Sequence, residues 1–164
     1  KLADGLAKEG IEVYLISSQL NLPILDNGTM ATIVKEEHLD KVFLGGHSLG
    51  GVVSTVEAKN LNENNKVEGL ILLASYPDKS TDISNTSIPV LSITASNDKI
   101  LNQDKYQDGK SRLPQSTIYT TIEGGNHSGF GLYGQQNGDG EATLEAEKQQ
   151  EQLIQLIKNF IETH

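Results

Sequence analysis

Apolar residues follow two spacings that alternate along the chain. Short apolar runs predict buried strands, and the segments between them have apolar residues at helical intervals. The expected strands are Ile11 to Ile16, Lys41 to Leu44, Val67 to Ala74, Pro89 to Thr94 and Thr117 to Ile122. The expected helices are Leu2 to Ala7, Thr29 to Leu39, the stretch after Ser48, Asn102 to Arg112 and Thr143 to Thr163. This alternation predicts an α/β fold, with a mainly parallel sheet and helices on both of its faces.

The chain has 164 residues, a length that favours one domain spanning residues 1–164. Leu2, Ala3, Leu6 and Ala7 have helical spacing from the first residues, with no N-cap before them. We therefore expect the N-terminal part of the fold to be missing from this sequence. We favour a cytoplasmic location, with export as the alternative because the natural N-terminus is expected to lie upstream.

The charge of the chain argues against a nucleic-acid partner, and its hydropathy argues against a membrane span. With 22 acidic and 13 basic residues the net charge is −9, which repels phosphate backbones, so we expect no nucleic-acid partner. No apolar run approaches the roughly 20 residues of a membrane span.

The absence of cysteine excludes disulfides, thiolate zinc sites and cysteine nucleophiles. We expect no metal and no cofactor.

A glycine-rich turn follows the expected strand that ends at Leu44. It reads Gly45-Gly46-His47-Ser48-Leu49-Gly50-Gly51, and a helical pattern begins directly after it. A G-x-S-x-G turn between a strand and a helix is typical of a nucleophile elbow, in which glycines two positions either side of the serine avoid collisions. Ser48 is then the nucleophile, and the Leu49 amide donates to the oxyanion. The alternative is a glycine-rich turn whose serine has no chemical role.

A serine nucleophile needs a base, and the chain offers four histidines. His38 falls among charged residues late in an expected helix, and His164 is the last residue. His47 adjoins the nucleophile, where we expect it to point into the packing or the pocket wall. His127 lies in a loop directly after the last expected strand. It is the predicted base, and a histidine with only a local hydrogen bond is the alternative.

The base in turn needs a carboxylate that accepts a hydrogen bond from its imidazole. Asp98 follows the expected strand Pro89 to Thr94 and lies between Ser48 and His127 in the chain. Asp78 and Asp82, which follow the preceding strand, are the competing candidates. We predict that Asp98 fills this role.

Taken together, these motifs resemble the α/β-hydrolase superfamily. The order Ser, Asp, His and the elbow are shared with it, and the stretch from Gly125 to Gly140 looks like the small bacterial branch often labelled "hydrolase fold-5". The resemblance covers essentially the whole chain. It implies a small, lidless serine hydrolase that acts on carboxylic esters or similar acyl compounds. It also implies that early strands, and a loop with a second oxyanion amide, have no counterpart before Lys1.

The long loop that carries His127 has two interpretations. Its side chains Asn126, Tyr133, Gln136 and Asp139 could line the substrate pocket, together with His47. The alternative, which we favour for the loop residues, is a loop whose side chains bond to one another while its glycines make turns. One carboxylate in such a turn does not predict a calcium site.

The predicted function is therefore hydrolysis of a small-molecule acyl substrate through an acyl-enzyme intermediate on Ser48. A binding domain that keeps the fold without the activity is the alternative, because fold alone does not establish function. If strand Ile11 to Ile16 is an apolar sheet edge, it also favours association with another chain.

Overall fold

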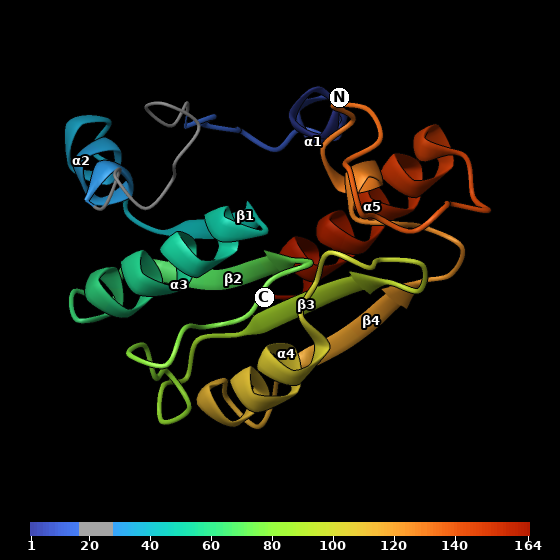
Figure 1. The fold of residues 1–164 in the computed structure, drawn as a ribbon. Coiled ribbons are helices and arrows are strands. Elements are labelled where there is room, and N and C mark those ends of the chain that lie inside the picture. Colours follow the sequence, from blue (N-terminus) through green and yellow to red (C-terminus); the bar gives the residue numbers. More distant parts are fainter. Residues whose placement is uncertain (17–27) are drawn as a thin grey trace.

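The computed structural model of the protein describes residues 1–16 and 28–164. At its centre is a parallel sheet with the strand order β1-β2-β3-β4 (Figure 1). The strands are β1 (Val42–His47), β2 (Val67–Leu73), β3 (Val90–Ala95) and β4 (Ile118–Ile122). Since all of them run in the same direction, their carboxyl ends meet at one edge of the sheet, where ligands bind in folds of this kind.

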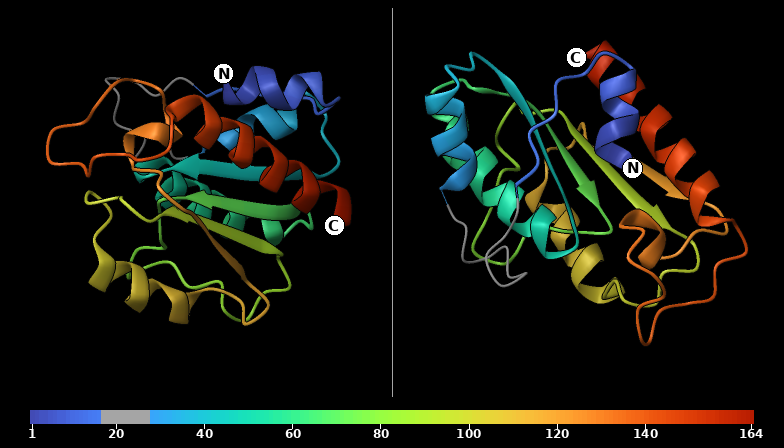
Figure 2. Two further views of the ribbon diagram at one scale, coloured as in Figure 1. Left: turned by 90° about the vertical axis from the view of Figure 1, so that its right-hand side faces the viewer. Right: turned by 90° about the horizontal axis from the view of Figure 1, so that it is seen from above.

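Helices cover both faces of the sheet (Figure 2). One face carries α2 (Thr29–Glu36), α3 (Leu49–Asn62) and α4 (Gln103–Gly109), and the other carries α1 (Leu2–Lys8) and α5 (Ala146–Thr163). The loops of the described residues include the short 3-10 helices η3 (Lys110–Arg112) and η4 (Ser128–Phe130). No helix in the described ranges is long and apolar enough to cross a membrane.

The side chains of β2 explain why both faces are covered. Leu70 and Leu72 point to one face and pack with Ala58 of α3, whereas Ile71 and Leu73 point to the other and pack in the cluster that includes α5. Successive side chains of a strand point to opposite faces, so an almost uniformly apolar strand requires cover on both. The predicted fold class is thus confirmed.

Three helices differ from the predicted boundaries. α2 ends at Glu36 rather than Leu39, because His38 has a φ of 54° and leaves the helical conformation. The segment expected as one helix from Asn102 becomes α4 followed by η3. α5 begins at Ala146 rather than Thr143, because the amides of Thr143 and Leu144 both donate to the carbonyl of Gly124.

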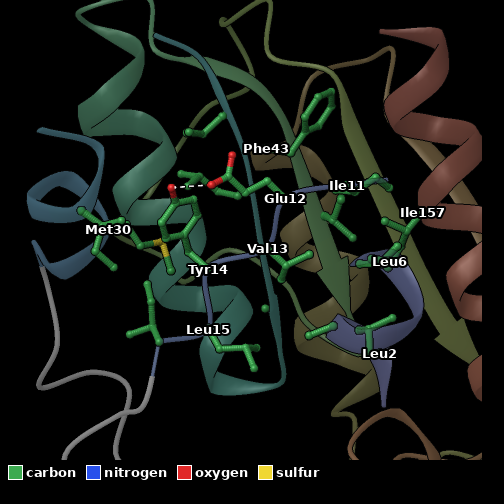
Figure 3. A pocket seen from close by; sticks show the side chains of 18 of the residues that line it. Leu2, Leu6, Ile11, Glu12, Val13, Tyr14, Leu15, Met30, Phe43 and Ile157 are labelled. Carbon is green, nitrogen blue, oxygen red and sulfur yellow. Dashed lines mark hydrogen bonds between the residues drawn. The ribbon is translucent and has the colours of Figure 1, made fainter. Parts of the chain in front are cut away.

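The predicted strand Ile11 to Ile16 is wrong. This segment belongs to no strand, and a cavity of about 480 Å³ separates it from β1 (Figure 3). Apolar side chains from both sides line the cavity, among them Leu6, Ile11, Val13 and Phe43. A ladder forms only when backbones approach to about 4.8 Å. The segment pairs with no strand of the sheet, and the space between it and β1 stays open. Within the described chain the free edge on this side of the sheet belongs to β1, and association through an edge stays a prediction.

Candidate active site

Ser48 occupies the sharp turn between β1 and α3. It has a φ of 54°, which is uncommon for a residue with a side chain. Two contacts with the neighbouring strand and its loop hold this conformation: the Ser48 amide donates to the Leu73 carbonyl at 2.9 Å, and the Ser75 hydroxyl donates to the Ser48 carbonyl at 2.7 Å. Strained backbone of this kind persists where surrounding contacts over-determine it, and it clusters at functional sites.

The glycines of the turn have unequal roles. A Cβ on Gly46 would collide with the backbone of Gly50, and one on Gly51 would collide with the side chain of Ser75. A Cβ on Gly50 would meet nothing within 4 Å. The expectation that a side chain would collide at both positions is therefore correct for Gly46 and wrong for Gly50. A side chain would fit at Gly50, and it is the Gly50 backbone that leaves no room for a Cβ on Gly46.

Asp98 and His127 form a buried pair beyond the ends of β3 and β4. Oδ2 of Asp98 lies 2.8 Å from Nδ1 of His127, and both side chains are almost fully buried. Oδ1 of Asp98 accepts hydrogen bonds from the amides of Ile100 and Leu101, each at 2.8 Å. The carboxylate is thus oriented by its own loop, and the second nitrogen of the imidazole, Nε2, is left for another partner.

Ser48 and His127 line the same small pocket, whose volume is about 70 Å³. Leu49 also borders it, and as the first residue of α3 its amide is among those that have no acceptor within the helix. The remaining lining residues are Val52, Ala74, Ser75, Tyr76, Ile100, Leu101 and Asn102. None of these was identified from sequence as a pocket residue, because they come from three separate segments that only the fold brings together.

His47 lies outside that pocket, on the wall of the large cavity beside β1. Its ring centroid is 4.4 Å from that of His127 and 5.5 Å from that of Phe130. Its Nε2 atom is buried and makes no hydrogen bond within the described residues. Burial, followed by the proximity of His127, lowers the pKa of His47 from 6.5 to about 4. His47 is therefore neutral when the protein is folded at neutral pH.

This lowered pKa makes the fold sensitive to acid. Between pH 6.5 and about pH 4, His47 is protonated in the unfolded protein but neutral in the folded protein. Protonation therefore stabilises the unfolded state, and the free energy of unfolding falls as the pH falls through this window. Between about pH 7.5 and about pH 5 we expect the native protein to lose about 2 kcal/mol more unfolding free energy than a His47→Asn variant. Urea unfolding at both pH values measures this difference, and equal losses would contradict it.

The loop residues proposed for the pocket bond to one another instead. The Asn126 side chain donates to the Gly140 carbonyl and accepts from the Gly129 amide, and the Tyr133 hydroxyl donates to Gln136. None of the three lines the pocket of Ser48 and His127 in the described structure. These contacts favour the interpretation of the loop as self-bonded, and a role in substrate binding stays a prediction.

The other histidines and aspartates considered from sequence lie elsewhere. His38 and His164 are exposed. Asp78 and Asp82 bond to Ser80 and Ser84, two residues further along their own loop. Over residues 1–16 and 28–164 no group of three or more acidic or histidine side chains is arranged to hold a metal ion.

A buried glutamine was missed by sequence reasoning. Gln149 of α5 accepts from the Asn126 amide at 3.1 Å and donates to the Asn126 carbonyl at 2.8 Å, so it holds the residue directly before His127. It also fills the space that a Cβ on Gly125 or Gly129 would need. The available signal was its place four residues before Leu153, on the apolar stripe of a helix where a polar residue needs a buried partner.

Comparison with solved structures supports the same fold. A monoacylglycerol lipase from Paleococcus ferrophilus has a TM-score of 0.69 at 13% identity, covering 97% of this chain and 88% of that one. Alpha/beta hydrolase domain-containing protein 10 from mouse has a TM-score of 0.69 at 14% identity, with 99% and 82% covered. A thermophilic esterase from Thermogutta terrifontis has a TM-score of 0.62 at 13% identity, with 99% and 85% covered.

Sequence comparison identifies the family. No curated protein matches the chain. The family model described as "Alpha/beta hydrolase family" matches residues 1–151, which is most of the chain. The chain therefore belongs to the α/β hydrolase family.

Proposed function

We propose that the protein is a serine hydrolase that cleaves small carboxylic esters or similar acyl compounds. The observation that carries this proposal is the buried Asp98 and His127 pair, 2.8 Å apart, whose His127 lines a pocket together with Ser48. Membership of the α/β hydrolase family and the lipase and esterase among its structural neighbours support a hydrolase. Ser48, His127 and Asp98 are the proposed nucleophile, base and orienting carboxylate.

In the proposed first step, the Ser48 hydroxyl attacks the carbonyl carbon of the ester while Nε2 of neutral His127 takes its proton. The carbonyl oxygen becomes an oxyanion, which accepts a hydrogen bond from the Leu49 amide. His127 then passes the proton to the departing alcohol, leaving an acyl group on Ser48. In the second step a water molecule, activated by His127, releases the acid.

Asp98 acts through His127. Its carboxylate accepts a hydrogen bond from Nδ1–H of His127, which fixes the tautomer that leaves Nε2 free to accept. It also stabilises the imidazolium that forms when His127 receives the serine proton. Burial of both side chains strengthens this interaction, because little water competes with it.

The size of the pocket favours a short acyl or alcohol group. A volume of about 70 Å³ beside Ser48 and His127 leaves room for few heavy atoms. We expect p-nitrophenyl acetate and propionate to be hydrolysed with higher kcat/KM than the butyrate and octanoate esters. Measured initial rates across this series test the expectation, and a rate that rises with acyl length would contradict it.

An active-site-directed probe tests the activity itself. A fluorophosphonate should add covalently to the folded protein and not to the heat-unfolded one, because only the folded state activates the hydroxyl. Addition to neither state would contradict the proposal and favour the alternative of a binding domain without activity.

A further inference from the structure

The hydrogen bond between Asp98 and His127 depends on two loops that are far apart in sequence. Asp98 follows β3 and His127 follows β4, 29 positions further along the chain. The two loops are joined by the pairing of β3 with β4 and by the Asn97 amide, which donates to the Gly125 carbonyl at 2.9 Å. Contacts beside Asp98 and His127 themselves then adjust the distance between the two side chains. A displacement of about 1 Å between catalytic groups can lower a rate about a hundredfold.

Asp139 contacts both loops through one carboxylate. Its Oδ2 atom accepts from the amide of Ser128 at 2.8 Å and from the Ser128 hydroxyl at 2.7 Å, directly after His127. Its Oδ1 atom accepts longer bonds from the Lys99 amide at 3.3 Å and the His127 amide at 3.4 Å. Lys99 is the residue directly after Asp98, so the carboxylate joins the backbone beside Asp98 to the backbone of the His127 turn.

The tip of the loop is docked by contacts that do not involve the Asp139 side chain. The Asn126 amide group donates to the Gly140 carbonyl at 2.8 Å, and that of Asn97 donates to the Glu141 carbonyl at 2.9 Å. Gly140 packs so closely on Asn97 that a Cβ would collide with the Asn97 carbonyl. Because these contacts are independent of the carboxylate, we expect a variant at position 139 to keep the tip in place.

Asp139 is also charged at neutral pH. Burial raises its pKa, but the hydrogen bonds from Ser128, Lys99 and Gly140 outweigh burial and leave the pKa below its ordinary value. An ionised carboxylate only accepts hydrogen bonds, and its two oxygens can accept several at once. It can therefore join two backbone segments whose amides all donate.

We propose that Asp139 is a positioning residue, whose carboxylate bridges the Asp98 loop to the His127 turn and keeps the two side chains in hydrogen-bond contact. This inference rests on the proposed function for its effect on rate. Its effect on the Asp98 and His127 hydrogen bond is independent of any reaction. Asp139 does not line the pocket of Ser48, so its loss should change kcat rather than KM.

The test compares Asp139→Ala with Asp82→Ala. Asp82 is a matched control because its carboxylate, like that of Asp139, accepts a hydrogen bond from a backbone amide, here that of Ser84, but contacts neither His127 nor Asp98. We expect Asp139→Ala to lower kcat on p-nitrophenyl acetate about a hundredfold with KM little changed, and Asp82→Ala to change neither. Asp139→Asn should restore part of the loss, because its amide oxygen can still accept from Ser128.

A second measurement is independent of activity. The imidazole proton shared by His127 and Asp98 should give a downfield proton resonance in the native protein, and this resonance should broaden or disappear in Asp139→Ala while the amide spectrum stays folded. Wild-type kcat with an unchanged resonance in Asp139→Ala would overturn the proposal. If Asp139→Ala does not fold, the Asp139→Asn variant is measured instead. A resonance and a kcat identical to those of the native protein in Asp139→Asn would likewise overturn the proposal. Failure of all hydrolysis would count against the proposed function, and the resonance would still test the bridge.

Discussion

Replacing Ser48 by alanine is expected to lower ester hydrolysis about a thousandfold or more, while leaving the fold intact. In the proposed mechanism the hydroxyl forms the covalent intermediate. No side-chain hydrogen bond of Ser48 is found within the described structure whose loss would unfold the turn. The backbone contacts that hold the turn, to Leu73 and Ser75, do not depend on the side chain. Initial rates on p-nitrophenyl acetate, with urea unfolding of both proteins, measure the effect.

Ser54→Ala is the matched control for that experiment. Ser54 lies on the same helix, α3, and its hydroxyl donates to the Gly50 carbonyl one turn earlier rather than facing the pocket. We expect this variant to keep the native rate. If Ser48→Ala keeps most of its activity, or if Ser54→Ala loses as much, Ser48 is not the nucleophile.

Replacing Asp98 by asparagine is expected to lower kcat about ten-thousandfold. An amide nitrogen facing Nδ1 would favour the imidazole tautomer that carries its proton on Nε2, and this tautomer cannot accept the serine proton. The variant also loses the charge that stabilises the imidazolium. The side chains have the same shape, and the amide oxygen can still accept from Ile100 and Leu101, so we expect the loop to fold as before.

Asp78→Asn and Asp82→Asn distinguish the carboxylates that sequence left open. Both side chains bond within their own loop, and neither contacts His127, so both variants should hydrolyse esters at the native rate. A rate unaffected by Asp98→Asn but strongly lowered by either of these changes would move the role to the loop after β2.

The strands of the sheet could be predicted where the pattern alone is sufficient. Val67 to Leu73 is almost uniformly apolar, and a strand covered on both faces needs no other signal. Ile11 to Ile16 has an equally apolar character but forms no strand, because strand formation also requires a partner within hydrogen-bond distance. Whether a neighbouring strand lies within reach depends on the three-dimensional arrangement of the chain. The spacing of apolar residues within one segment does not predict it.

The same distinction applies to the site. The positions of Ser48, Asp98 and His127 could be predicted because each follows a strand of a parallel sheet, and such sheets bring these ends to one edge. The structure brings Asp98 into contact with His127 in this way, while the roles of all three stay predictions. The bridge through Asp139 depends on loop conformation, for which the sequence has no periodic signal. Gln149 had a signal, a polar residue on the apolar stripe of a helix, but that signal does not identify the loop residue it holds.

The central claim is that Ser48 carries an acyl intermediate made possible by His127 and Asp98. Rapid mixing with p-nitrophenyl acetate, followed by an acid quench and mass spectrometry of the peptides, tests it most directly. The account predicts a burst of p-nitrophenol together with one acetyl group on the peptide that contains Ser48, and neither in the Ser48→Ala variant. An acetyl group found on another residue, or turnover in which the native protein shows neither a burst nor acetylation, would contradict it.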